Sequence, residues 1–198
     1  QPPHAILLVG PAGIGKGYVG WWLAAQLYGS LPEKIQAEPY VKAITPEKER
    51  TISIDAVRQL EHFLSLRVPG GTPRVAVIEN AHFMTTEAQN ALLKTLEEPP
   101  ANTYIILTAA SEQALLPTIR SRTVSVTVKR PSPAEMVSHF EKLGASRLVI
   151  DQAQLMSGGL PGLMDSLVKN DANHPLTQAV ATARAIIQKS AFDRLAMV

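Results

Sequence analysis

Short runs of consecutive hydrophobic residues mark the first half of the chain. They occupy residues 5–9, 75–78 and 104–107. Continuous apolar runs of this length are typical of strands that are buried on both faces of a parallel sheet. Farther on, valines alternate with polar residues over 124–128, which predicts a half-covered strand near the centre or edge of that sheet.

Segments with helical periodicity separate these strands. Residues 53–66 place valine and leucine side chains on one face behind Ser53 as the N-cap, and residues 85–97 repeat the pattern before Pro99 stops the helix. A parallel connection has to cross one face of the sheet, and a helix usually makes that crossing. The pattern therefore predicts an α/β fold, with a parallel sheet flanked by helices.

Residues 18–27 form an apolar segment that includes Trp21 and Trp22. Because the segment has almost no polar side, we expect a helix sandwiched between the sheet and another layer, with core packing favoured over ligand stacking for both tryptophans. Residues 30–49 contain three prolines and mixed charges without a clear period, and we predict no element there.

A second unit begins near residue 131. The segment Ser132-Pro133-Ala134-Glu135 combines an N-cap, a proline in the first turn and a capping-box glutamate, so we predict a helix over 133–143. Short helical segments follow, and 175–198 reads as one further helix. The chain thus divides into an α/β domain over 1–130, a small all-helical domain over 131–170, and the start of a truncated helical domain over 171–198.

Composition narrows the classes of function. Hydrophobic residues make up 45% of the 198 residues and the net charge is only +2, so a packed core is expected and a strong general attraction to nucleic acid is not. The chain has no cysteine and its five histidines are scattered, which argues against zinc and other metal sites. The longest apolar run falls short of the roughly 20 residues of a membrane helix, and no leader opens the chain. We expect a cytoplasmic protein, represented here by a fragment.

A glycine-rich loop follows the first buried strand and opens a helix. It consists of Gly10, Pro11, Ala12, Gly13, Ile14, Gly15, Lys16 and Gly17. In a P-loop, backbone N–H groups surround phosphate oxygens, while the lysine charge and the helix dipole add to the attraction. Gly17 stands where serine or threonine would give Mg²⁺ a hydroxyl. Binding of ATP or ADP is favoured, the role of Mg²⁺ stays open, and the alternative is a structural turn that binds no ligand.

The second hydrophobic strand ends in Glu79-Asn80, where a hydrolysing P-loop protein is expected to carry Asp-Glu. Glu79 could help to hold Mg²⁺ through a longer side chain. Asn80 is a neutral amide and cannot accept a proton from water at ordinary pH. Substitution by another acid, such as Glu87 or Glu112, is the alternative. The pair reads as a degenerate Walker B site.

Three motifs carry a family resemblance. They are ENAHFMT at 79–85, AQNALLKTLEEPP at 88–100 and LPTIRSR at 116–122. Together they resemble bacterial DNA polymerase III clamp-loader subunits of the AAA+ superfamily, and among these the delta-prime subunits, which are ATPase-deficient stators. The resemblance covers about residues 4–167. It implies an AAA+ P-loop domain followed by a small helical lid domain, and it makes 171–198 the start of a collar-like domain.

The resemblance also assigns roles to single residues. It places the sensor-one position near Ala110 and the sensor-two position near Gly162, and neither side chain can contact a γ-phosphate. The zinc module of motor subunits is absent, because the chain lacks cysteine. The family's Ser-Arg-Cys motif appears here with Thr123 in place of cysteine. Arg122 of this motif is implied to act in trans on the ATP of a neighbouring subunit; the alternative is a surface arginine at a strand entry.

Three functions follow from these readings. The first is a stator-like clamp-loader subunit in DNA replication without ATPase activity of its own. Its implied partners are gamma/tau-like and delta-like subunits, the sliding clamp and, through the complex, primer-template DNA, and no membrane is involved. The second is an active gamma/tau-like motor that hydrolyses ATP in cis through Lys16 and Glu79. The third is a nucleotide-free interaction module that kept the fold.

Overall fold

A computed structural model describes residues 2–47, 51–169, 178 and 182 of the chain. The chain divides into two compact units, Gln1–Lys129 and Arg130–Val198, and each is described by itself. The helix predicted over 175–198 and the unit predicted over 171–198 lie outside the described residues, apart from the two isolated positions.

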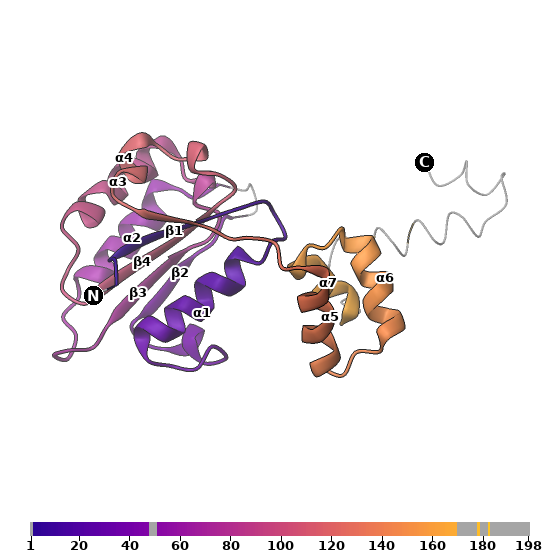
Figure 1. Ribbon diagram of the computed structural model, residues 1–198. Helices are drawn as coiled ribbons and strands as arrows, with labels where there is room; N and C mark the ends of the chain where they lie inside the picture. Colours follow the sequence, from indigo (N-terminus) through magenta and orange to yellow (C-terminus); the bar gives the residue numbers. More distant parts are fainter. Residues whose placement is uncertain (1, 48–50, 170–177, 179–181, 183–198) are drawn as a thin grey trace. The chain divides into compact units, whose positions relative to one another are not determined.

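The first unit contains a five-stranded parallel sheet (Figure 1). Its strand order is β2-β3-β4-β1-β5, and every neighbouring pair is parallel. The predicted parallel α/β sheet is therefore confirmed. The strands are β1 (Ala5–Val9), β2 (Val41–Ile44), β3 (Arg74–Ile78), β4 (Thr103–Ala109) and β5 (Val124–Thr127).

Helices cover both faces of this sheet, so the unit has three layers. In Figure 1, α1 lies on one side of the strands, and α2 and α3 lie on the other side with α4. Alternate residues of each strand point to opposite faces, so Leu8 and Val77 pack under α1 while Leu7 and Ile78 pack under the other helices. The helices are α1 (Lys16–Tyr28), α2 (Ile54–Ser65), α3 (Thr86–Glu97) and α4 (Pro117–Arg120), with 3₁₀ turns η1 (Ile35–Ala37), η2 (Ala81–Phe83) and η3 (Glu112–Ala114).

The predicted Ser53 cap is present, and Thr85 caps α3 in the same way. Ser53 Oγ accepts from the Ala56 amide at 3.3 Å, and Thr85 Oγ1 accepts from the Ala88 amide at 3.2 Å. Each hydroxyl pairs an N–H that has no partner inside its helix, which fixes where the helix begins. Local sequence therefore sets these two boundaries.

Two expectations about the first unit were wrong. The helix α1 is not sandwiched among the described residues, since Tyr18 is 74% exposed and Trp22 is 47% exposed. Its apolar outer side faces solvent, and Trp22 does not belong to the core. The segment 30–49, for which we predicted no element, contains η1 and β2. The strand escaped detection because it is short, half-exposed and at the sheet edge, so burial imposes little pattern on it.

The second unit consists of the helices α5 (Pro133–Lys142), α6 (Arg147–Ser157) and α7 (Pro161–Val168) in its described part. The predicted capping box is present, because Ser132 Oγ accepts from the Glu135 amide and the Glu135 carboxylate accepts from the Ser132 amide. A small core joins the helices; its members are Met136, Val137, Phe140, Ile150, Ala153 and Met164.

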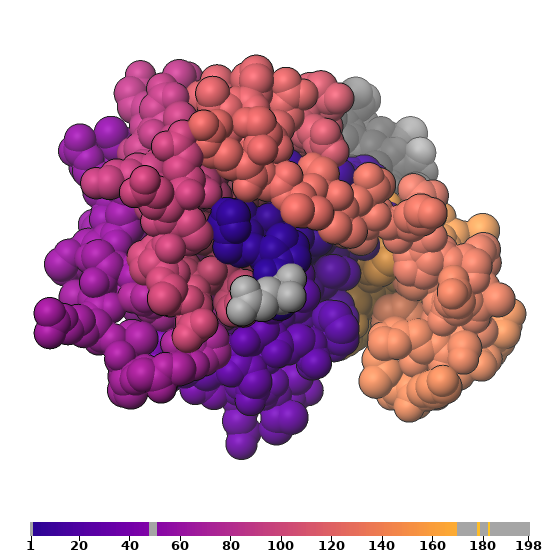
Figure 2. Space-filling view, turned by 60° about the vertical axis from the view of Figure 1, so that its left-hand side comes forward, coloured from indigo at the N-terminus to yellow at the C-terminus, as the bar shows by residue number. Residues whose placement is uncertain are grey.

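The strands of the parallel sheet all point the same way, so the sheet has one side formed by their amino ends and one formed by their carboxyl ends, called here its amino-terminal and carboxyl edges. At the amino-terminal edge, the exposed residues before β1 reach the surface, where they are seen in indigo in Figure 2. The carboxyl edge carries the loops that follow the strands, and all predicted P-loop and acidic residues lie there. No described helix is both long and apolar enough to cross a membrane.

Candidate functional site

The carboxyl edge of the sheet brings the glycine-rich loop and the acidic strand end together. The loop follows β1 and Glu79-Asn80 follows β3, and the strand order leaves β4 between them. Two hydrogen bonds tie both segments to β4: the Gly10 amide donates to the Ala109 carbonyl at 3.3 Å, and the Asn80 amide donates to Thr108 Oγ1 at 2.8 Å. Sequence motifs about 65 residues apart thus share one edge, as is usual for ligand sites in open α/β sheets.

Lys16 turns back onto its own loop. Its Nζ donates to the carbonyl oxygens of Gly10 at 2.7 Å and Pro11 at 2.8 Å, and the residue is 8% exposed. Burial lowers the pKa of the Lys16 amine from its ordinary value, because desolvation disfavours the charged form. The Lys16 ammonium group therefore links two carbonyl oxygens within its own loop. A phosphate would have to compete with these carbonyl oxygens for the ammonium group.

The loop amides are arranged for an anion. Gly13 and Gly15 have positive φ values of 77° and 96°, a conformation that glycine adopts without a steric penalty. The N–H groups of Gly13, Gly15 and Gly17 have no hydrogen-bond acceptor among the described residues. Together with the N-terminus of α1 they form the kind of backbone nest that attracts phosphate oxygens. These residues fit the polyphosphate of a nucleotide.

Glu79 is held by a tryptophan. The Trp21 indole Nε1 donates to Glu79 Oε1 at 2.7 Å, and this bond is partly buried. On the same helix, Gly20 lies against Leu8, Ile106 and Thr108, so α1 packs directly on the sheet. Sequence reasoning missed this partnership, which depends on the packing of a helix against a strand end 58 residues away.

Asn80 lies in the left-handed region, with φ 51° and ψ 49°, and is the N-cap residue of η2. Of the two acids considered as substitutes, Glu112 lies in η3 and Glu87 in the first turn of α3. The pKa of Glu87 is lowered because its own backbone N–H and the Thr85 hydroxyl donate to it. A lowered pKa makes a carboxylate a weaker general base. This lowered pKa argues against Glu87 as the general base.

His82 is a residue near the loop that sequence reasoning did not single out. Its Nδ1 is buried and has no hydrogen-bond partner among the described residues. Burial lowers the His82 pKa, and the positive charge of Lys16 lowers it further. Both effects favour the neutral imidazole.

Arg122 lies after α4, at the entry to β5. Its guanidinium makes an ion pair with Glu97 at 2.5 Å and donates to the Thr118 carbonyl at 3.0 Å and to Ser121 Oγ at 3.2 Å. The arginine side chain is 34% exposed. The LEEPP and LPTIRSR motifs thus meet through one ion pair, and the guanidinium is oriented while still open to solvent.

Gln89 fixes the segment that leads to Arg122. Its side chain is buried; Oε1 accepts from the Leu116 amide at 2.8 Å, and Nε2 donates to the Met84 carbonyl at 3.3 Å. Leu116 is the N-cap residue of α4 and makes no side-chain cap of its own. One amide therefore connects η2, α3 and the start of α4.

We expect Gln89→Ala to lower the free energy of unfolding by about 1–2 kcal/mol, since it leaves the Leu116 amide and the Met84 carbonyl without their partner. Chemical denaturation of the two proteins measures the difference. Gln113→Ala, which removes an exposed glutamine from η3, is the matched control and should leave the midpoint unchanged. Equal midpoints for both variants would contradict the role of Gln89.

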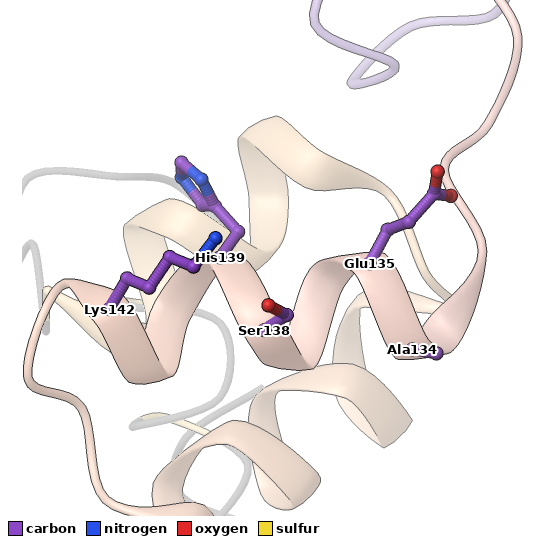
Figure 3. Close-up of a pocket in the computed structure, with 5 residues that line it drawn as sticks. All are labelled: Ala134, Glu135, Ser138, His139 and Lys142. Carbon is purple, nitrogen blue, oxygen red and sulfur yellow. The ribbon is translucent and has the colours of Figure 1, made fainter.

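The remaining candidate positions contribute no polar group to this edge. Ala110 directly follows β4, and Gly162 lies in α7 of the second unit. A shallow, open hollow of about 440 Å³ lies along one face of α5 (Figure 3). Its side chains project from a single helix, and none belongs to the glycine-rich loop, the acidic strand end or the three motifs of the family resemblance. No group of three or more potential metal-ligating His, Cys, Asp or Glu side chains occurs among the described residues.

Comparison with known proteins gives consistent matches. A family profile described as DNA polymerase III, delta subunit, matches residues 1–132. The DNA polymerase III subunit delta' of Pseudomonas aeruginosa is 31% identical over 206 residues, which cover 96% of this chain and 63% of the relative. The protein of the same name from Escherichia coli is 29% identical over 197 residues, covering 90% of this chain and 59% of the relative. The chain thus spans about three fifths of the length of these relatives.

A solved structure shows the same fold. The DNA polymerase III gamma subunit-related protein of Thermotoga maritima has a TM-score of 0.64 to this chain at 24% identity, with coverage of 96% of this chain and 60% of that protein. The predicted AAA+ fold class is thereby confirmed, with its parallel sheet flanked by helices and the helical unit that follows.

Proposed function

The chain belongs to the family described as DNA polymerase III, delta subunit, and from that membership we propose that it is a stator-like, non-motor subunit of a DNA sliding-clamp loader. In DNA replication it would donate Arg122 to the ATP held by a neighbouring subunit. The resemblance to delta-prime subunits indicated by the three motifs is confirmed by the matches over most of the chain.

The observation that carries the proposal concerns Glu79 and Asn80, the two residues that follow β3. Hydrolysis at a P-loop needs a group that positions or deprotonates water and ligands that hold the metal. Here Glu79 is bonded to Trp21, Asn80 is a neutral amide, and the lowered pKa of Glu87 makes it a weak general base. These features support a site that does not hydrolyse ATP in cis.

The surroundings of Arg122 support its proposed action on the ATP of a neighbouring subunit. An arginine acting in trans has to be accessible and oriented, and it has to keep its charge. Arg122 is partly exposed and fixed by three partners in its own chain, and guanidinium groups stay protonated at all physiological pH values. A motor-type subunit that binds Mg²⁺ and ATP next to this surface is the partner with which such a group would act.

The proposed assembly follows from the family. Gamma/tau-like and delta-like subunits, the clamp and, through the complex, primer-template DNA are its proposed partners. The free amides of the glycine-rich loop support binding of ATP or ADP by this chain. The alternative function, a gamma/tau-like motor, keeps the same fold and loop but requires turnover in cis.

Turnover separates the two functions. We expect the purified chain with ATP and Mg²⁺ to release phosphate no faster than its Lys16→Ala variant. Because Asn80 cannot accept the proton of an attacking water, Lys16 has no hydrolysis to support. Phosphate release is measured under multiple-turnover conditions, with a folded state verified by circular dichroism for both proteins. Turnover that Lys16→Ala abolishes would establish the motor function instead.

A further inference from the structure

The hydrogen bond between Trp21 and Glu79 involves the acidic residue at the strand end, the kind of residue with which a P-loop enzyme holds its metal ion. In such enzymes Mg²⁺ is held between the hydroxyl of the loop and the acidic end of the neighbouring strand. In this chain, Trp21 of α1 donates to Glu79 Oε1 at 2.7 Å, and Glu79 directly follows β3. A neutral N–H donor has become the partner of the carboxylate.

The residues at this edge do not fit a magnesium ion. Mg²⁺ requires oxygen ligands in near-octahedral geometry, and P-loop proteins supply them from a hydroxyl and a carboxylate. Gly17 supplies no hydroxyl, although an added Cβ would meet no atom within 4 Å. Packing therefore does not require glycine at this position. Trp21 takes Oε1 of Glu79 and Asn80 is uncharged, so of the usual protein ligands the hydroxyl is missing and the carboxylate keeps only Oε2 for a metal.

Trp21 is more than an incidental neighbour of Glu79. A partly buried carboxylate without a partner is costly, and the indole N–H removes that cost without a cation. Indole is a donor only, so it cannot share a metal ion with the carboxylate. The ring also packs against the hydrophobic cluster beneath α1, so moving it away would cost apolar contacts. The arrangement stabilises Glu79 in a metal-free state.

We propose that Trp21 makes the P-loop site selective for nucleotide without its metal ion. The site takes a nucleoside di- or triphosphate as the free polyanion, held by the loop amides and Lys16. The inference rests on the nucleotide binding included in the proposed function and specifies which form of nucleotide binds. Trp21 acts here as a specificity-determining residue through its hydrogen bond to Glu79.

ADP binding with and without metal tests this directly. Isothermal titration calorimetry of the chain with ADP is carried out in excess MgCl₂ and in excess EDTA. We expect the affinity in EDTA to exceed the affinity in MgCl₂, because Mg²⁺ gains no protein ligand and competes for the phosphates. Equal affinities or tighter binding in MgCl₂ would overturn the proposal, and so would the absence of ADP binding in both buffers.

Variants test the assignment to Trp21. Gly17→Ser combined with Trp21→Phe restores a hydroxyl and frees the carboxylate while keeping an aromatic ring. This double variant should bind ADP about tenfold more tightly in MgCl₂ than in EDTA, the scale on which groups around a metal alter its affinity. Adding Glu79→Gln should abolish that preference. Gly17→Ser combined with Trp22→Phe, which changes the exposed neighbouring tryptophan instead, is the matched control and should show no preference for the metal.

A folded double variant whose ADP affinity does not respond to metal would overturn the role of Trp21. The test is independent of turnover, because ADP is not hydrolysed. Metal-dependent ADP binding by the unmodified chain, without phosphate release from ATP, would defeat this inference and leave the proposed stator function intact.

Discussion

Arg122→Ala is expected to slow ATP hydrolysis at the neighbouring subunit's site by about three orders of magnitude, the lower end of the range for arginine fingers. The guanidinium would no longer neutralise the charge that develops on the γ-phosphate. Arg122→Lys should restore little of this rate, because a point charge does not reproduce the planar fork. The measurement is single-turnover phosphate release by the assembled loader. ATP sites that do not contact Arg122 are expected to keep the rates of the unmodified loader.

Assembly and folding have to be separated from this effect. Arg58 is an exposed arginine on α2 whose ion pair with Asp55 spans 3.8 Å, and Arg58→Ala is the matched control. Both variants should assemble as the unmodified chain does, as judged by size-exclusion chromatography. An assembled Arg122→Ala loader that hydrolyses ATP at the unmodified rate would refute the role in trans.

Arg74→Ala should cause the largest loss of stability. Arg74 is 7% exposed and donates to the carbonyl oxygens of Leu64, of Leu66 at 2.7 Å and of Ala101 at 3.1 Å. Two of these carbonyls belong to the end of α2, where a helix has unpaired acceptors and a partial negative charge. Charged hydrogen bonds of this kind and the acceptors left behind account for a loss of about 2–4 kcal/mol.

Urea denaturation measures this loss as a shift of the midpoint at constant slope. Arg58→Ala again serves as the control and should cost no more than about 0.5 kcal/mol, because exposed ion pairs contribute little. Arg74→Lys should lower the free energy of unfolding by an amount between the losses for Arg58→Ala and Arg74→Ala, since one ammonium group cannot reach all three carbonyls. A midpoint for Arg74→Ala equal to that of Arg58→Ala would contradict the bridging role.

The sequence predicted those parts of the fold that depend on local pattern or on burial from two sides. The run at 75–78 is apolar because β3 is covered on both faces, and the cap at Ser53 acts within one turn of chain. The edge strand β2 was missed because solvent on one side relaxes its pattern. The outer side of α1 was misjudged because apolar composition alone does not show which face meets the sheet.

The candidate site was predictable as a set of residues and unpredictable as a set of contacts. Lys16, Glu79 and Arg122 could be selected from motifs. Their partners could not, because these depend on strand order and helix packing. The bond from Trp21 to Glu79 requires α1 to lie on the sheet beside β3, and the pair of Arg122 with Glu97 requires α3 and α4 to meet.

In the proposed role in trans, the ion pair between Arg122 and Glu97 would make the binding of a phosphate by Arg122 an exchange of one anion for another. A phosphate that draws Arg122 away has to displace a carboxylate that already neutralises it, so the net gain is smaller than for an unpaired cation. A small net gain keeps the contact easy to reverse. A complex that hydrolyses ATP repeatedly needs contacts between subunits that form and dissociate in every cycle. Because Glu97 can re-form its ion pair with Arg122, it would favour this dissociation.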